Sequence, residues 1–97
     1  MAKTRKEKIQ KKRITFTLNK TDAEEVILMG DFNNWNNKKH QMKKYEGGVW
    51  KKIVMLPPGR CEYKFQVDGQ WMLDPNNSQK CSNCFGSYNN ILTIPKK

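Results

Sequence analysis

Two tryptophans stand among polar residues, outside any apolar run that would bury them. Trp35 is flanked by two asparagines on each side, and Trp71 follows the turn signal Asp68-Gly69. The flat face of an indole packs against the C–H-rich face of a hexose, while side-chain amides hydrogen-bond its hydroxyl groups. The pattern indicates a sugar-binding surface. The alternative, equally compatible with the spacing alone, is that both indoles cap the loose ends of a β-sandwich.

The sequence predicts no catalytic centre. His40 is the single histidine, it has no acidic neighbour in its strand, and we interpret it as a solvent-facing residue. The chain contains neither a Gly-x-Ser-x-Gly nucleophile motif nor a phosphate-binding glycine loop. We therefore expect a protein that is not an enzyme and that needs no cofactor.

The three cysteines allow two further alternatives. Cys81 and Cys84 have the spacing of half a structural zinc site, and Cys61 with His40 would complete a Cys₃His set. A structural zinc site normally has a second closely spaced pair of ligands, which this chain lacks. Cys61 also has the strand parity of Tyr63, as a small core residue would. We therefore expect no metal. A Cys81–Cys84 disulfide is favoured over zinc. The odd number of cysteines leaves a free thiol, which suits a reducing compartment.

Positive charge is concentrated at the N-terminus. The 97-residue chain has a formal net charge of +10, and residues 1–13 contain seven basic side chains and one acidic side chain. We predict a basic, disordered tail over residues 1–13, which could contact an anionic partner but serves solubility most simply, and one domain over residues 14–95. No secretory signal or membrane-spanning apolar stretch is evident, which favours a cytoplasmic protein without a membrane partner.

The elements that must position these residues are β-strands. From residue 14 onward, short apolar runs alternate with turn signals at the regular spacing of an all-β sandwich. The Asp68-Gly69 pair supplies the positive φ angles of a type I′ hairpin turn. A long loop is expected over residues 74–87. The predicted strands cover residues 14–18, 25–30, 39–45, 49–56, 61–67, 70–73 and 89–94.

The strand parity predicts which side chains face the core. Along residues 61–67, Tyr63 and Phe65 point to one side, and Lys64 points to the other side of the sheet. In the strand 49–56 we assign Trp50 to the core. The same parity turns Lys52 inward, so we expect Lys52 near a sheet edge, where its stem can reach solvent.

Several motifs occur in an order that resembles a known family. Over about residues 14–95, the chain resembles the glycogen-binding domain of the AMP-activated protein kinase β subunit and the starch-binding modules of carbohydrate-binding module family 48. That family includes the early-set domains of branching and debranching enzymes. The resemblance implies an immunoglobulin-like β-sandwich without a catalytic centre. The matching segments are Gly30-Asp31-Phe32-Asn33-Asn34-Trp35, Gly48-Val49-Trp50, Leu56-Pro57-Pro58-Gly59, Glu62 to Trp71, Asp74-Pro75 and Phe85-Gly86-Ser87-Tyr88-Asn89-Asn90.

The resemblance also implies a set of carbohydrate-binding residues. The two stacking tryptophans and a lysine on the strand before the hairpin have counterparts here. The family also has an apolar side chain, leucine in kinase-type domains, that lies inside the curve of the glucan, and this side chain has a counterpart here. Two further counterparts contact sugar through a hydroxyl and an amide group. Serine for threonine and phenylalanine for leucine keep the chemistry but leave fine specificity open. The residues are Trp35, Trp71, Lys64, Phe85, Ser87 and Asn89.

These observations favour non-catalytic binding of α-1,4-glucan, such as glycogen or starch, by stacking on exposed tryptophans. The alternative is a protein-interaction or scaffold module that regulates or targets a glycogen-metabolising enzyme or kinase in trans. Nucleic-acid binding is a third hypothesis, based on the net charge and the exposed aromatic residues. The asparagine-rich loops and the limited charge beyond residue 13 disfavour it.

Overall fold

The computed structural model describes residues 10–96. The predicted tail over residues 1–13 therefore lies mostly outside the described residues. Its last two members, Lys12 and Arg13, already belong to the first strand, which begins two residues before the predicted boundary. Within the described part of the chain, no helix is long and apolar enough to cross a membrane.

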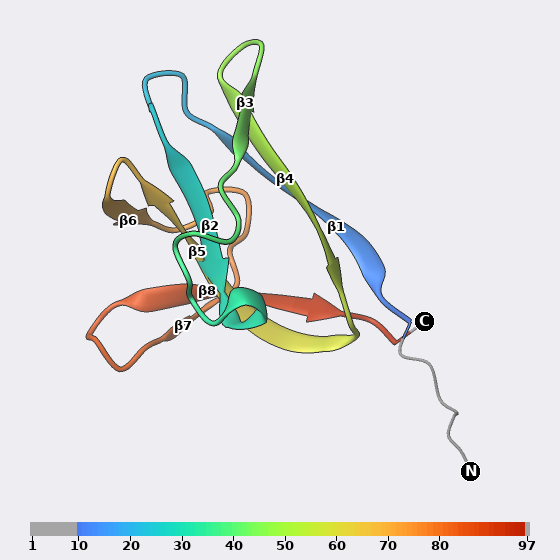
Figure 1. Ribbon diagram of the computed structural model, residues 1–97. Coiled ribbons are helices and arrows are strands. Elements are labelled where there is room, and N and C mark those ends of the chain that lie inside the picture. Colours follow the sequence, from blue (N-terminus) through green and yellow to red (C-terminus); the bar gives the residue numbers. More distant parts are fainter. Residues whose placement is uncertain (1–9, 97) are drawn as a thin grey trace.

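Two antiparallel sheets build the domain, and they confirm the prediction of an all-β sandwich (Figure 1). The three-stranded sheet has the order β1-β4-β3, with β1 (Lys12–Asn19), β4 (Val49–Leu56) and β3 (Lys43–Tyr45). The five-stranded sheet has the order β2-β5-β8-β7, and β6 also pairs with β5. Its strands are β2 (Val26–Gly30), β5 (Gly59–Val67), β8 (Tyr88–Ile94), β7 (Lys80–Ser82) and β6 (Gln70–Met72).

The core fills the space between the sheets and follows the predicted alternation. Each strand with one buried face contributes every second residue, because successive side chains point to opposite sides of a sheet. Trp50 is buried as predicted, and its Nε1 donates to the carbonyl of Lys20 at 3.0 Å. The buried apolar residues of the two sheets include Phe16, Leu18, Leu28, Val54, Leu56, Tyr63, Phe65 and Val67. Each contributes about 1.5–3 kcal/mol through burial.

The predicted strand over residues 39–45 is wrong as a single element. Its first part pairs with β2, where the amide of Leu28 donates to the carbonyl of His40 at 2.9 Å and Gln41 bridges Ile27. Only the last part, β3, pairs with β4. The chain therefore crosses from one sheet to the other at this edge. Because β3 covers β4 only as far as Lys51, the half-buried Lys52 lies beside the open edge, as expected.

A short 3-10 helix, η2 (Asp31–Asn33), follows β2 and holds His40 in place. The side chain of Asn33 accepts from the amide of Gly30 at 3.1 Å and donates to the carbonyl of Leu28 at 3.0 Å. The same amide nitrogen lies 2.7 Å from Nδ1 of His40. His40 is thus half-buried, which corrects the prediction of a solvent-facing side chain. The position of η2, which no single strand pattern encodes, is the reason.

A buried polar network orders the segment that was predicted to be a long loop. Asn90 accepts from the amide of Asp74 at 2.7 Å and donates to the carbonyl of Asn77 at 3.0 Å. The hydroxyl of Tyr63 donates to Asp74 at 2.7 Å, and burial raises the pKa of Tyr63 above its usual range. The segment also contains β7, which the sequence analysis did not predict. This network fixes the approach of the chain to β7 and β8.

The first prediction concerns Asn90. Replacement of Asn90 by Ala should lower the free energy of unfolding by about 2–4 kcal/mol, because it leaves the buried amide of Asp74 and the carbonyl of Asn77 without partners. Urea denaturation followed by circular dichroism measures the change. Asn37→Ala is the matched control, since Asn37 is exposed and should change stability by less than about 0.5 kcal/mol. Equal stability of the two variants would contradict the role of the network.

The second prediction concerns pH. Burial, Lys52 and Lys39 all lower the pKa of His40, and Nδ1 can accept from Asn33 only in the neutral ring. Near pH 7.5 the folded and unfolded states are both neutral at this ring. As pH falls through the ordinary histidine value of about 6.5, the unfolded chain binds a proton first, so stability decreases.

The measurement compares the wild-type chain with the His40→Gln variant. The difference in unfolding free energy between pH 7.5 and pH 5, from urea titrations, should be larger in the wild-type chain. Carboxylates titrate equally in both proteins and cancel from the comparison. The same loss of stability in both proteins would show that His40 does not contribute.

Candidate functional site

A hollow of about 750 Å³ lies on the outer side of the five-stranded sheet. Lys64 on β5 lines it, and the neighbours of Lys64 along the strand point into the core. The lining includes all six residues that the sequence analysis assigned to sugar binding, although they come from the turn after η2, from β5, β6 and β8, and from the β7–β8 connection. The lining residues are Asp31, Trp35, Glu62, Lys64, Trp71, Ser82, Asn83, Cys84, Phe85, Ser87 and Asn89.

The two predicted indoles lie side by side. The ring centroids of Trp35 and Trp71 are 6.2 Å apart, with an angle of 66° between the ring planes. Trp71 is 50% exposed and Trp35 is half-buried, and neither belongs to the core between the sheets. The edge-to-face arrangement makes an angled aromatic surface rather than a flat one.

Trp35 is held by a strained turn after η2. The backbone of Asn34 and of Trp35 is left-handed, with φ angles of 57° and 56°, which non-glycine residues rarely adopt. The amide of Trp35 donates to the carbonyl of Gly30 at 3.0 Å, and its Nε1 donates to Asp31 at 3.1 Å. The second carboxylate oxygen of Asp31 accepts from the amide of Glu62 at 2.8 Å. Asp31 therefore links the indole of Trp35 to β5 through two hydrogen bonds.

Lys64 faces the hollow as predicted, but it is not solvent-exposed. Its exposure is 6%, because Trp71 and Ser87 cover it. The ammonium group donates to Oγ of Ser87 at 2.9 Å and lies 5.7 Å from the centroid of the Trp71 ring. Burial lowers the pKa of Lys64. The ammonium group of Lys64 thus contacts both Trp71 and Ser87, which lies in the β7–β8 connection.

Phe85 stands at the tip of a compact loop that Asn83 organises. The side chain of Asn83 accepts from the amides of Phe85 and Ser87 at 2.9 and 3.0 Å and donates to Asn89 at 3.0 Å. Phe85 is 87% exposed, which places an apolar ring in solvent at the rim of the hollow. The sequence analysis missed Asn83. Its signal was an asparagine two residues before Phe85, a spacing typical of an Asx turn.

Asn89 lies at the floor of the hollow, with both ends of its amide engaged. Nδ2 donates to Glu62 at 3.1 Å, and Oδ1 accepts from Asn83. The hydrogen bond from Asn89, followed by contacts with Cys81 and Arg60, holds the pKa of Glu62 below its usual value. The sequence analysis missed Glu62 and Asp31 as members of this site. Their carboxylates add acceptors that hydroxyl groups of a ligand can use.

The cysteines form neither of the predicted alternatives. Cys61, Cys81 and Cys84 are free thiols, and Cys84 lines the hollow. The sulfur of Cys81 lies 3.6 Å from a guanidinium nitrogen of Arg60. Over residues 10–96, no group of three or more histidine, cysteine or acidic side chains is arranged to hold a metal ion. Of the three thiols, only that of Cys84 borders the hollow.

The arrangement suits a ligand with apolar faces and many hydroxyl groups. The hollow offers three exposed or half-exposed aromatic rings and a rim of amide, hydroxyl, carboxylate and ammonium groups. Two carboxylates and one ammonium give the lining no excess of positive charge. Such a lining disfavours a polyanionic ligand.

Comparison with known proteins gives one family. Its model, described as the glycogen recognition site of AMP-activated protein kinase, matches residues 12–97. Protein PTST homolog 2, chloroplastic, from Arabidopsis thaliana is 44% identical over 72 residues, which cover 74% of this chain and 13% of that protein. The human 5'-AMP-activated protein kinase subunit beta-2 is 39% identical over 74 residues, 76% of this chain and 26% of the subunit.

A third relative, Protein FLOURY ENDOSPERM 6, chloroplastic, from Oryza sativa subsp. japonica, is 40% identical over 72 residues, 74% of this chain and 13% of that protein. The chain thus spans between about an eighth and a quarter of the length of these three relatives. Because the family model covers all but the first eleven residues, this chain belongs to the family of glycogen recognition domains of AMP-activated protein kinase.

Proposed function

We propose that this domain binds α-1,4-glucan chains such as glycogen or starch and catalyses no reaction on them. The observation that carries the proposal is the pair of accessible indoles, 6.2 Å apart, in a hollow that also holds Phe85. Family membership supports the same ligand class. The proposed contact residues are Trp35, Lys64, Trp71, Phe85, Ser87 and Asn89.

The geometry of the aromatic rings matches a curved chain. Successive glucose units of an α-1,4-glucan turn relative to one another, so two indoles inclined by 66° can each meet the face of a different unit. Phe85, exposed at the rim, then packs against the inner side of the curve. Each stack contributes about 1 kcal/mol beyond the area that it buries. An open surface with few contacts gives dissociation constants of roughly micromolar to millimolar.

The polar groups orient the sugar. Ser87 accepts from Lys64, which leaves its own hydroxyl proton free to donate to the ligand. The ammonium of Lys64 carries three protons, so it can reach a sugar hydroxyl while it keeps Ser87 in place. Since Asn89 is already bonded at both ends, it contributes its remaining N–H and lone pair. These groups are positioned before the ligand arrives, which reduces the entropy cost of binding.

The wider role of the chain is also a proposal. We infer a non-enzymatic module that can bring a glycogen-metabolising enzyme or kinase to a glucan in trans, and the names of the kinase subunit relatives support this direction. A cytoplasmic location stays a prediction, since the names of two relatives carry the word chloroplastic. The division into a basic tail and a carbohydrate-binding module, predicted at residues 1–13 and 14–95, is likewise proposed, with the boundary moved to Lys12, where β1 begins.

The third prediction tests the indoles. Trp35→Ala and Trp71→Ala should each weaken binding of maltoheptaose by about 5- to 30-fold, through loss of stacking and buried area. The double variant should lose retardation in a glycogen affinity gel. Isothermal titration calorimetry measures the single variants. Tyr88→Ala is the matched control, because Tyr88 is an exposed aromatic residue outside the hollow. A folded double variant that is still retarded by glycogen would refute the site.

The fourth prediction tests the ligand class. Maltoheptaose should bind with nearly the same affinity at about 50 and 500 mM salt, because a neutral ligand releases no counterions. Cellohexaose, a straight β-1,4 chain, should bind at least about tenfold more weakly, since it cannot follow the angle between the indoles. Tryptophan fluorescence titrations give both comparisons. Equal binding of the two sugars would contradict recognition of curvature, and a steep salt dependence would point to a polyanionic ligand.

A further inference from the structure

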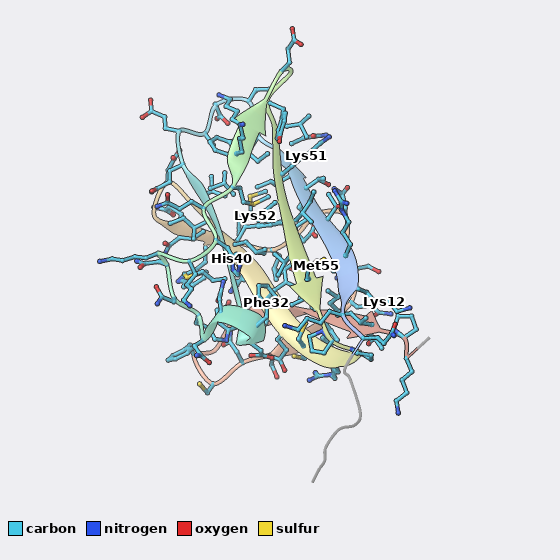
Figure 2. The ribbon with its side chains drawn as sticks, turned by 45° about the vertical axis from the view of Figure 1, so that its right-hand side comes forward. Lys12, Phe32, His40, Lys51, Lys52 and Met55 are labelled. Atoms are coloured by element: carbon cyan, nitrogen blue, oxygen red, sulfur yellow. The ribbon has the colours of Figure 1, made fainter. Side chains whose placement is uncertain are left out.

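The outer side of the three-stranded sheet presents a second surface, on the opposite side of the sandwich from the hollow. We call it the basic face and define it by Arg13, Lys43, Tyr45, Lys51, Ile53 and Met55. The strand register makes them neighbours, because Arg13 pairs with Met55 and Lys43 pairs with Lys51. Figure 2 shows Lys51 and Met55 along β4, with Lys12 near the start of β1.

The cations of the basic face take part in no ion pair within residues 10–96, and the nearby Glu46, which directly follows Tyr45, is in none either. The strands β1, β3 and β4 contain no aspartate or glutamate. The ion pairs of the described residues are Lys20–Asp22 and Arg60–Glu62, so no cation of this face takes part in them. Lys43 and Lys51 lie directly opposite each other, which destabilises the sheet. Their ammonium groups lie 5.7 and 5.3 Å from the ring centroid of Tyr45.

The same face is also apolar. Tyr45, Ile53 and Met55 are between 46% and 52% exposed, although each belongs to a regular strand. Met55 also borders a second hollow of about 330 Å³. Its lining combines charged residues, Lys11, Arg60 and Asp31, with apolar ones, Phe32, Leu56, Pro57, Pro58 and Ile94. A hollow of this kind accepts an apolar side chain of a partner, and buried anchors of this type dominate the energetics of protein interfaces. The combination is typical of an interaction surface rather than of a solvated sheet.

We propose that the basic face binds an acidic polypeptide segment that carries apolar side chains, while the hollow on the other sheet binds glucan. Carboxylates of the segment pair with Arg13, Lys43 and Lys51, and its apolar side chains cover Ile53 and Met55. A nucleic acid would match the charge but would leave the aliphatic side chains exposed. A second copy of this chain would bring equal charges together, which opposes association.

The test uses two peptides of equal charge: twelve residues that alternate glutamate with leucine, and the same peptide with serine in place of leucine. Isothermal titration calorimetry at about 150 mM salt should show at least about tenfold tighter binding of the leucine peptide. Amide chemical shifts in ¹⁵N spectra should change on β1, β3 and β4. Saturating maltoheptaose should alter the affinity by less than about twofold. Every protein compared keeps residues 1–13, so attraction to those residues contributes equally.

Two double variants separate the charged and apolar contributions. The double variant Lys43→Glu, Lys51→Glu should weaken the binding of both peptides at least about tenfold. The double variant Lys38→Glu, Lys80→Glu makes the same charge change outside the basic face and should weaken their binding less than about threefold. Ile53→Ser with Met55→Ser should weaken only the leucine peptide. Equal losses in the two charge variants, equal binding of the two peptides, or tighter binding of a twelve-nucleotide poly-dT would each overturn the proposal.

Discussion

The alternation of side chains along β5 is the constraint on which the rest of the molecule depends. Tyr63, Phe65 and Val67 point into the core, so Glu62 and Lys64 must point out of the opposite side of the same sheet. The strand also pairs with β2, β8 and β6, which bring the other contributors of the hollow to it. A shift of one residue in this register would place the core residues in solvent and remove the floor of the hollow.

Short polar side chains fix the aromatic rings relative to β5 through hydrogen bonds. Asp31 links the indole of Trp35 to the backbone of Glu62, and Asn83 links the Phe85 loop to Asn89. Each of these side chains bonds to backbone amides as well as to a neighbouring side chain. Consequently hydrogen bonds within the protein hold the Trp35 indole and the Phe85 loop in place, and several of them balance the strained turn at Trp35.

The sequence predicted those parts of the fold in which a local pattern and the packing agree. The strand over residues 49–56 has the predicted bounds, and the Asp68-Gly69 turn has positive φ angles at both residues, because alternation and turn chemistry are local signals. The crossing near Gln41 and the strand β7 were not predicted, since both depend on partners distant in sequence. Lys-Cys-Ser, the sequence of β7, carries no apolar alternation.

In the candidate site, too, some residues could be predicted from the sequence and others could not. The resemblance named six residues that the structure brings to one hollow, but it gave no account of the groups that position them. Asp31 and Glu62 looked like ordinary acidic residues, and the burial of Lys64 could not be predicted from parity, because Trp71 and Ser87 cover it from other strands. A residue that acts through hydrogen bonds to the backbone is hard to recognise in a sequence, because its partners are distant along the chain.

The distribution of charge lets the two faces of the sandwich work independently. Among the strands, the acidic side chain is Glu62, which lines the hollow on the five-stranded sheet, whereas the strands of the three-stranded sheet carry cations and no acidic residue. A glucan carries no charge, so its binding to the five-stranded sheet changes the electrostatic potential at the three-stranded sheet very little. If both proposals hold, a neutral polymer and an acidic polypeptide can bind at the same time, because the two proposed sets of contact residues do not overlap.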